Sequence, residues 1–381
     1  MEGILNRLVS NTEKPYQDIF MELKKNFGKK LVGCVPMHVP EEIISAAGLI
    51  PVLIMGSKEP VTLGHKYVPP YFCSPVQELT DLAVKHQLTA LEGIIVPNTC
   101  HETRGLKDVI QRHSGINWVR GLYLPPTLQS RHIKLYLVEC FGELRQSLGE
   151  LSGQEVSDEA LHASISIYNR NRSLMKELYR LRRNHPEVIS PKQMAAIVLS
   201  GTLMPKDAHN EILETMVSKL EQISFSGKKK NVRLILSGNF CKPIQGELLD
   251  LMEETGGMVV DDDLYMGSRY YATLVKEEGD PLEALADAYI YRVPPCPTRY
   301  NPDNDWGEYL TDMARTSSAK AVITLVVKFC EPHLYYYRLV QKKLGEAGIA
   351  ELMIETAAEE AQLPKIKTKL QAFVEMLAVL G

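Results

Sequence analysis

Three cysteines stand at, or just past, the ends of segments that the sequence predicts to be buried. They are Cys73 in YFCSPVQE, Cys100 in GIIVPNTCHETRG and Cys330 in AVITLVVKFCEPH. Two of them directly follow apolar β-type runs, and in open α/β sheets ligands collect at the carboxyl ends of strands. Each also lies at a predicted helix start, where the helix dipole favours a thiolate. Thiolates delivered from distant parts of a chain suit a soft-metal or iron–sulfur site between two domains.

On spacing alone, these thiols have other interpretations. They are also compatible with a zinc site or with ordinary buried thiols, because most unpaired cysteines behave as small core residues. Cys34 ends another predicted strand and is a reserve ligand. Of the remaining cysteines, Cys140 is expected in the core, while Cys241 and Cys296 lie in loops that could approach the same cleft.

Several polar residues near the predicted strand ends could handle protons. His38 and Glu41 follow the first predicted strand, where a histidine beside carboxylates could act as acid or base. Alternatively, Glu41 and Glu42 serve only as favourable charges at a helix N-terminus. His101 and His333 lie one and three residues from a candidate ligand. They could tune a cluster by hydrogen bonding or supply a proton.

The segment VDDDLYMGSRYY (260–271) contains a further candidate, Asp262. We expect its three carboxylates to follow a short strand. They could bind a polar substrate, hold a cation or line a cleft between domains. The alternative is an acidic strand end followed by its helix cap.

Common cofactor signatures are absent from the sequence: there is no GxxxxGK[ST], no GxGxxG after a strand, no HExxH, no GxSxG and no CxxC. We therefore expect no bound nucleotide cofactor on this chain. The net charge of −4 indicates neither nucleic acid nor membrane as a partner. Neither a signal peptide nor an apolar run of about 20 residues is present, so the prediction is cytoplasmic. Seven cysteines there are expected to be thiols, ligands or core residues, not disulfides.

The elements that would position these residues alternate between strand and helix in two parts of the chain. The first part predicts strands at 30–35, 49–55, 91–96 and 118–124, with helices at 40–47, 74–85 and 102–113. Segments 129–149, 157–185, 191–199 and 204–224 have helical periodicity. Alternation then resumes, with strands at 232–236, 258–260, 321–327 and 350–354 and helices at 243–255, 281–291, 332–346 and 358–379.

The predicted fold class is therefore α/β, with two doubly wound, Rossmann- or flavodoxin-like parallel sheets and a helical bridging segment. The expected organisation is a helical lead (1–28), a first α/β domain (29–128), a helical bridge (129–228) and a second α/β domain (229–381).

At these residues the sequence resembles the benzoyl-CoA reductase/2-hydroxyacyl-CoA dehydratase family. The blocks that carry the resemblance run in order from about residue 33 to 338: VPMHVPEEIISAAGLIPV, YFCSPVQE, IIVPNTCHETRGL, VVDDDLYMGSRYY, PPCPT and VVKFCEPHLYYY. The resemblance implies two α/β domains with a [4Fe–4S] cluster between them, bound by Cys73, Cys100 and Cys330. Three thiolates leave one iron without a protein ligand.

The resemblance also implies partners and a reaction. A related second subunit would pair with this chain, and a separate ATP-hydrolysing iron–sulfur activator would inject one electron at low potential. The acceptor would be an acyl-CoA or aroyl-CoA thioester, whose carbonyl becomes a ketyl radical anion. The blocks are most similar to the smaller, substrate-handling subunit of ATP-dependent benzoyl-CoA reductase, although His101 replaces an expected acidic residue. The alternatives are a 2-hydroxyacyl-CoA dehydratase subunit, which eliminates water, and a non-catalytic cluster scaffold that relays electrons.

Overall fold

The computed structural model describes residues 2–57, 59–222, 231–238, 244, 246–356 and 363–379. Cys241, one of the predicted loop cysteines, lies outside these ranges. Within them the strands form two four-stranded sheets, which we call the N-terminal sheet and the C-terminal sheet. All their strand pairs are parallel. The predicted α/β class with two parallel sheets is confirmed.

The N-terminal sheet has the strand order β2-β1-β3-β4. Its strands are β1 (Leu31–Cys34), β2 (Ile50–Leu53), β3 (Gly93–Pro97) and β4 (Trp118–Leu122). The connections carry α3 (Glu41–Ala46), a short 3₁₀ turn η1 (Gly64–Lys66), α4 (Ser74–Val84) and α5 (His101–His113). The chain first adds β2 on one side of β1 and then β3 on the other side, so the strand order reverses next to β1. Ligands are expected at the carboxyl end of β1, next to this switch point.

The C-terminal sheet repeats this topology in the order β6-β5-β7-β8. Its strands are β5 (Val232–Gly238), β6 (Gly257–Leu264), β7 (Ala321–Val327) and β8 (Ala350–Thr356). The helical elements are α10 (Gly246–Glu254), the π-turn η2 (Tyr265–Arg269), α11 (Pro281–Tyr291), α12 (Trp306–Thr316), α13 (Glu331–Glu346) and α14 (Leu363–Val379). All seven residues of β7 are buried, as the apolar run AVITLVV predicts for a central parallel strand.

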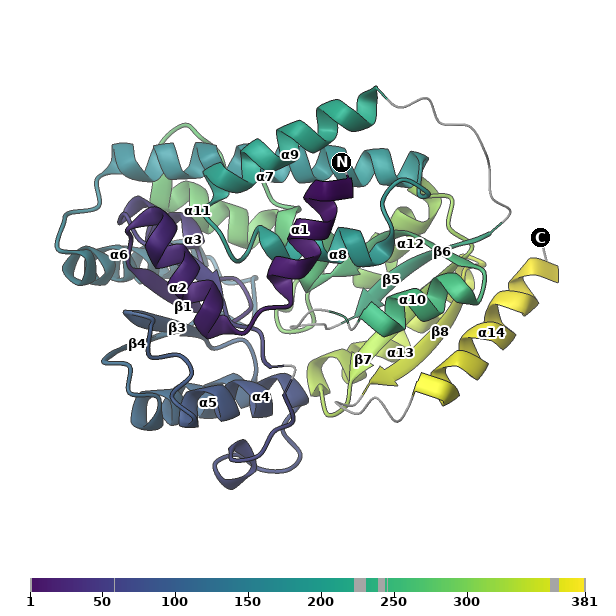
Figure 1. Cartoon of the computed structure of the whole chain (residues 1–381), viewed down its shortest axis with the longest axis horizontal. Coiled ribbons are helices and arrows are strands. Elements are labelled where there is room, and N and C mark those ends of the chain that lie inside the picture. The colour runs from purple at the N-terminus through teal and green to yellow at the C-terminus, as the bar shows by residue number, and fades with distance from the viewer. Residues whose placement is uncertain are drawn as a thin grey trace.

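A layer of helices joins the two sheets across one side of the molecule (Figure 1). It contains α6 (Ile133–Ser152), α7 (Asp158–Asn184), α8 (Pro191–Ser200) and α9 (Lys206–Glu221). The long helix α7 packs against α3 of the N-terminal half and against β6 of the C-terminal half. One apolar core cluster accordingly combines residues of the N-terminal sheet, the helical layer and α11, whereas the strands of the C-terminal sheet pack in separate clusters.

Three details differ from the sequence prediction. The lead is two helices, α1 (Glu2–Thr12) and α2 (Tyr16–Phe27), because Pro15 lies between them as the N-cap of α2. Helix α12 was not predicted. Strand β6 is longer than residues 258–260 and includes the three aspartates, which are buried within the strand and do not follow it. Over the described residues, no helix combines the length and apolar character needed to cross a bilayer.

Candidate functional site

All three candidate cysteines are N-caps of helices. Cys73 caps α4, Cys100 caps α5 and Cys330 caps α13. Cys100 and Cys330 follow β3 and β7, which are the strands in equivalent positions of the two sheets. Each cysteine is half-buried and none is in a disulfide. The sequence thus places a thiol at the positive end of a helix three times.

Electrostatic effects connect the surroundings of the three cysteines, mainly through Glu102. Burial, the Glu102 carboxylate and the Cys330 thiol raise the pKa of Cys73 well above its ordinary value. Glu102 Oε2 accepts a hydrogen bond from the backbone N–H of Cys73 at 3.0 Å. Burial, and to a smaller extent Glu102, also raise the pKa of Cys100. The pKa of Glu102 is itself raised, by burial and by Glu331 beside Cys330. Glu102 of α5 therefore lies near the helix starts of both halves: it accepts from Cys73 and is affected by Glu331.

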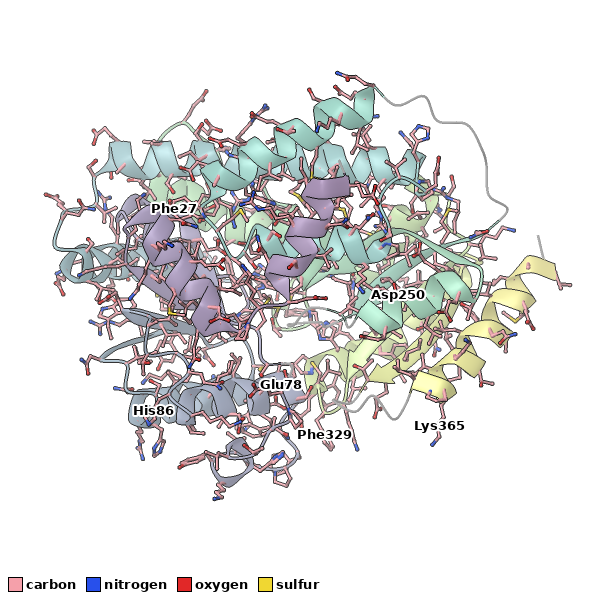
Figure 2. All side chains as sticks on the ribbon, viewed as in Figure 1. Phe27, Glu78, His86, Asp250, Phe329 and Lys365 are labelled. Atoms are coloured by element: carbon pink, nitrogen blue, oxygen red, sulfur yellow. The ribbon has the colours of Figure 1, made fainter. Side chains whose placement is uncertain are left out.

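These residues lie where the two halves meet. Figure 1 shows α4 and the β7–α13 connection next to each other in this view, and the effect of Cys330 on the pKa of Cys73 shows that they are neighbours. Figure 2 labels Glu78 on α4 and Phe329 just before Cys330. Phe329, which precedes Cys330, has a φ of 69°, a left-handed conformation that bulky residues rarely adopt. Such strain is common where a fold over-determines the backbone near a functional site.

Across the ranges that the structure describes, no three His, Cys, Asp or Glu side chains form a ready-made metal site. The donor chemistry nevertheless suits a soft metal or an iron–sulfur cluster, since three thiols stand at helix N-termini and Cys330 is close enough to Cys73 to raise the pKa of its thiol. Cys34 is fully buried in the sheet, and burial and Glu41 raise the pKa of its thiol well above normal. Cys140 is half-buried in α6, as expected for a residue that packs against the core.

A cavity of about 130 Å³ lies between the halves. Its wall includes the segment after β1, the helices α6 and α7, the start of α9, the end of β5 and the segment after β6. Six phenylalanine and tyrosine side chains contribute to it: Phe141, Tyr168, Tyr265, Tyr270, Tyr271 and Tyr289. An enclosure that combines an apolar surface with a few polar groups is typical of a small-molecule site.

His333 connects this cavity to the cysteines. It lines the cavity, and its Nδ1 lies 3.5 Å from Cys330 Sγ. Burial and the guanidinium of Arg269 lower the pKa of His333 to about 3, so the imidazole is neutral. Its ring stands edge-on to Trp306, with the centroids 5.2 Å apart. The cavity and the Cys330 helix start therefore belong to one region.

His38 occupies the opposite wall of the cavity. Its φ is 67°, and its backbone N–H donates to the hydroxyl of Tyr265 at 2.9 Å. The ring lies edge-on to both Tyr265 and Tyr289. Burial, Arg299 and Arg269 lower its pKa well below the ordinary value, and its buried Nε2 has no hydrogen-bond partner. A neutral imidazole with an unused nitrogen can bind a polar atom of a ligand.

Glu41 lies in the same cavity and is the centre of a hydrogen-bonded group. Tyr270 donates to its Oε1 at 2.5 Å, and the hydroxyl of Tyr168 lies 3.4 Å from its Oε2. The ammonium of Lys206 lies 3.4 Å from the same Oε2. Next to it, Glu42 forms an ion pair with Arg172 at 2.5 Å. An interaction with the helix dipole alone does not account for the position of the Glu41 carboxylate, because Tyr270, Tyr168 and Lys206 surround it.

The three aspartates of β6 have separate partners. Asp261 pairs with Arg183 at 2.9 Å, and Asp263 pairs with Arg269 and accepts from the indole N–H of Trp306. Asp262 accepts hydrogen bonds from the Tyr179 hydroxyl at 2.8 Å and from the backbone N–H of Ser268 at 2.8 Å. It borders a second, smaller cavity and does not line the larger one.

The structure thus brings His38 and Glu41 together in one cavity, with His333 linking that cavity to Cys330. His101 is exposed beside Phe72, and Asp262 lies apart. Cys296 also lines the cavity. Sequence reasoning missed several residues of this cavity, among them Lys206, Tyr168, Tyr270 and Arg172. The only available signal was the block DDDLYMGSRYY, whose tyrosines were not singled out.

Comparisons with known proteins give the same family. The chain is 28% identical to the (R)-phenyllactyl-CoA dehydratase beta subunit of Clostridium sporogenes over 97% of this chain and 100% of the relative. It is 26% identical to a benzoyl-CoA reductase subunit of Thauera aromatica, over 97% and 98%. It is 29% identical to the beta subunit of lactoyl-CoA dehydratase of Anaerotignum propionicum, over 99% of each.

The family described as 2-hydroxyglutaryl-CoA dehydratase, D-component, matches residues 36–377. This range includes the cysteines at the three helix starts and every residue of the cavity. The resemblance drawn from the sequence blocks is therefore confirmed, and the chain belongs to the 2-hydroxyglutaryl-CoA dehydratase D-component family.

Proposed function

We propose that this chain is the iron–sulfur subunit of a low-potential, ATP-activated reductase of CoA thioesters that resembles benzoyl-CoA reductase. As a family member, it is an enzyme subunit that acts on an acyl-CoA thioester. The reaction would proceed by single electrons, through a ketyl radical anion of the thioester carbonyl. The location of this enzyme would be the cytoplasm.

The observation that supports the proposal is that three cysteines cap helices, two in the N-terminal half and one in the C-terminal half, and that Cys330 lies near Cys73. Cys73 and Cys330 come from different halves of the chain, yet Cys330 is close enough to Cys73 to raise the pKa of its thiol. Glu102 interacts with both sides of the junction. A site assembled from two domains by their helix N-termini favours a negatively charged group bound through thiolates.

Cys73, Cys100 and Cys330 would hold a [4Fe–4S] cluster, with one iron left without a protein ligand. When bound, the cluster would supply single electrons at low potential to the thioester. Metal ligation requires thiolates, whereas burial holds protons on Cys73 and Cys100 in the metal-free chain. Loading is therefore expected to release protons and to favour higher pH.

The cavity next to Cys330 is the proposed site of the acyl group. Its aromatic walls would exclude water from the reacting atoms, which strengthens every electrostatic contact inside. His38 Nε2 is free to hydrogen-bond a polar atom of the ligand. Glu41 is the proposed group that exchanges a proton with the acyl group.

The proposed partners are a related second subunit and an ATP-hydrolysing iron–sulfur activator. The relatives are themselves named as subunits of larger enzymes. Large apolar side chains are exposed on and just before α13: Phe329 (40%), Leu334 (39%), Tyr335 (79%) and Leu339 (60%). This set, which we call the α13 patch, adjoins Cys330 and is the proposed contact with the second subunit.

Anaerobic purification tests the cluster. We expect the wild-type chain to carry iron and sulfide, and Cys100→Ser, Cys73→Ser and Cys330→Ser each to lose iron, because each removes one of three thiolate ligands. Cys140→Ser is the matched control, since that thiol lies in α6 away from the junction, and it should keep its iron. A colourless, iron-free wild-type protein would overturn the proposal.

A 2-hydroxyacyl-CoA dehydratase subunit is the second candidate. The family description and the names of two relatives favour it, because they refer to dehydratases. The two functions differ in electron use, since reduction of an aromatic ring consumes electrons whereas elimination of water returns them. Assays of the reconstituted complex with benzoyl-CoA and with phenyllactyl-CoA or lactoyl-CoA separate them. Turnover with only a hydroxyacyl thioester would replace the leading proposal with the second.

A further inference from the structure

Lys206 is a buried cation in an unfavourable place. It is the first residue of α9, where the positive end of the helix dipole repels it, and its side chain is only 4% exposed. Burial lowers the pKa of its ammonium group, while Glu41 acts in the opposite direction. Replacing a buried ion pair with apolar residues often leaves stability unchanged or raises it. Stability alone therefore gives little reason for a lysine at this position.

The hydrogen bonds around Lys206 have a forced direction. An ammonium can only donate and a carboxylate can only accept. The Tyr270 hydroxyl lies 2.9 Å from Lys206 Nζ and 2.5 Å from Glu41 Oε1, so it accepts from the lysine and donates to the glutamate. Lys206 also donates to the carbonyl of Gly201. All three ammonium protons have partners within the protein, and Lys206 has none to spare for a ligand.

Glu41, in contrast, retains an acceptor site. A carboxylate has about four lone-pair positions. Tyr270 uses one on Oε1, and Tyr168 and Lys206 approach the two on Oε2 at 3.4 Å each. One position on Oε1 is left, and Glu41 lines the cavity. Three donors from three elements therefore fix this carboxylate while leaving it able to take a proton.

The other charged groups near Glu41 do not provide the same fixation. Glu42 and Arg172 neutralise each other at 2.5 Å. Besides Lys206 and this pair, the titratable groups that face Glu41 from the elements packed against it are Cys34, Tyr168, Tyr270 and Tyr271. His209, from α9, adjoins Lys206. Lys206 is the cation among them that both contacts Glu41 and shares a hydroxyl with it.

We propose that Lys206 is a positioning residue for Glu41. Together with Tyr270, it fixes the Glu41 carboxylate in the wall of the cavity, where that carboxylate exchanges a proton with the bound acyl group. In that step a C–H bond of the acyl group breaks as an O–H bond forms on Glu41, or the reverse, and the electron pair stays with carbon. The inference rests on the proposed function, because it assumes that the acyl group enters this cavity.

The test is the pH profile of the reconstituted complex with the thioester that the wild type turns over. Lys206→Met should lower kcat about 100-fold, since a small misplacement of a reacting group costs that much. KM should change little. Removal of the cation should move the acid-side half-maximum upward by about one pH unit. Tyr270→Phe keeps the ion pair between Lys206 and Glu41, so it should lower kcat less and shift the acid side in the same direction. It replaces Lys206→Met in the test if that variant does not fold.

Two further variants make the test specific. Arg170→Met with Glu214→Gln removes an exposed ion pair between α7 and α9, outside the cavity, and should leave the acid side of the profile in place. In a Glu41→Gln background, Lys206→Met should cause no further loss, because a positioning residue acts only through its target.

The outcomes separate the two hypotheses. A wild-type complex that turns over neither class of thioester defeats the proposed function, and this inference with it. If the wild type is active, an unchanged pH profile of the folded Lys206→Met variant, or of Tyr270→Phe in its place, overturns this inference and leaves the proposed function intact. The same holds if the losses of kcat caused by Lys206→Met and Glu41→Gln multiply in the double variant.

Discussion

At the scale of single residues, Asp262 shows how a buried charge alters pH dependence. Burial, and then Asp261, raise its pKa to about 6, even though Ser268 and Tyr179 donate hydrogen bonds to it. The native state thus holds this proton more tightly than the unfolded chain does. Its stabilising effect is present at low pH and is lost as pH rises from about 4 to about 6. A group that opposes folding at neutral pH is a candidate for a functional role, although its carboxylate is well partnered here.

We expect Asp262→Asn to remove this pH dependence. The gap between pKa 3.8 and about 6 corresponds to a penalty on the order of 3 kcal/mol above pH 6. Relative to wild type, the variant should therefore gain free energy of unfolding between pH 4 and pH 7. Urea titrations of both proteins across this range measure it. Parallel stability curves for the two proteins would contradict the assignment.

At the scale of elements, most strands and helices follow from local patterns. Buried runs such as AVITLVV predict β7 residue for residue, and the proline-led PEEIISAA predicts α3 closely. Helix α12 was not predicted. Its N-cap, Asp305, accepts a hydrogen bond from the N–H of Glu308, and an aspartate before a helical pattern is a local signal for a helix start. The burial of the β6 aspartates could not be predicted, because their partners Arg183, Tyr179 and Trp306 come from distant segments.

The candidate site divides along the same line. Local sequence made the three cysteines candidates, because it marks the strand or helix boundary at which each of them lies. His38 and Glu41 became candidates for the same reason. Lys206 and Tyr270 were missed because neither has a local signature: their meaning comes from contacts across 165 and 229 positions of the chain. Fold class and strand ends are local information, whereas the composition of a cavity is tertiary information.

The end of β5 gives an element-scale prediction. Gly238 has a φ of 134° and pairs with Leu325 of β7, and a Cβ there would lie 1.8 Å from the Leu325 carbonyl oxygen. We expect Gly238→Ala to lower the free energy of unfolding by at least about 2 kcal/mol, because backbone must shift. Gly279→Ala is the matched control, with a φ of 84° and open space around it. That variant should cost only about 1 kcal/mol, and equal losses would refute the close approach as the cause.

At the scale of the whole molecule, the two sheets are related by topology. Their strand orders correspond, and Cys100 and Cys330 follow corresponding strands. Each half offers a helix N-terminus to the junction, and α7 packs against α3 of the N-terminal half and β6 of the C-terminal half (Figure 1). The arrangement brings Cys73 and Cys330, which are far apart in sequence, close enough to interact, and large apolar side chains next to Cys330 are exposed. These exposed side chains form the α13 patch.

The α13 patch is expected to bind the second subunit. Tyr335→Ser with Leu339→Ser should weaken association with the co-produced subunit at least about tenfold, because exposed aromatic and aliphatic anchors dominate such interfaces. Thermal stability of the isolated chain should change little, since both side chains are largely exposed. Met376→Ser with Val379→Ser, on the exposed side of α14, is the matched control. Sedimentation of the two-subunit mixture measures the effect. If the α14 variant weakens association as much as the α13 variant does, the second subunit does not dock at the patch beside Cys330.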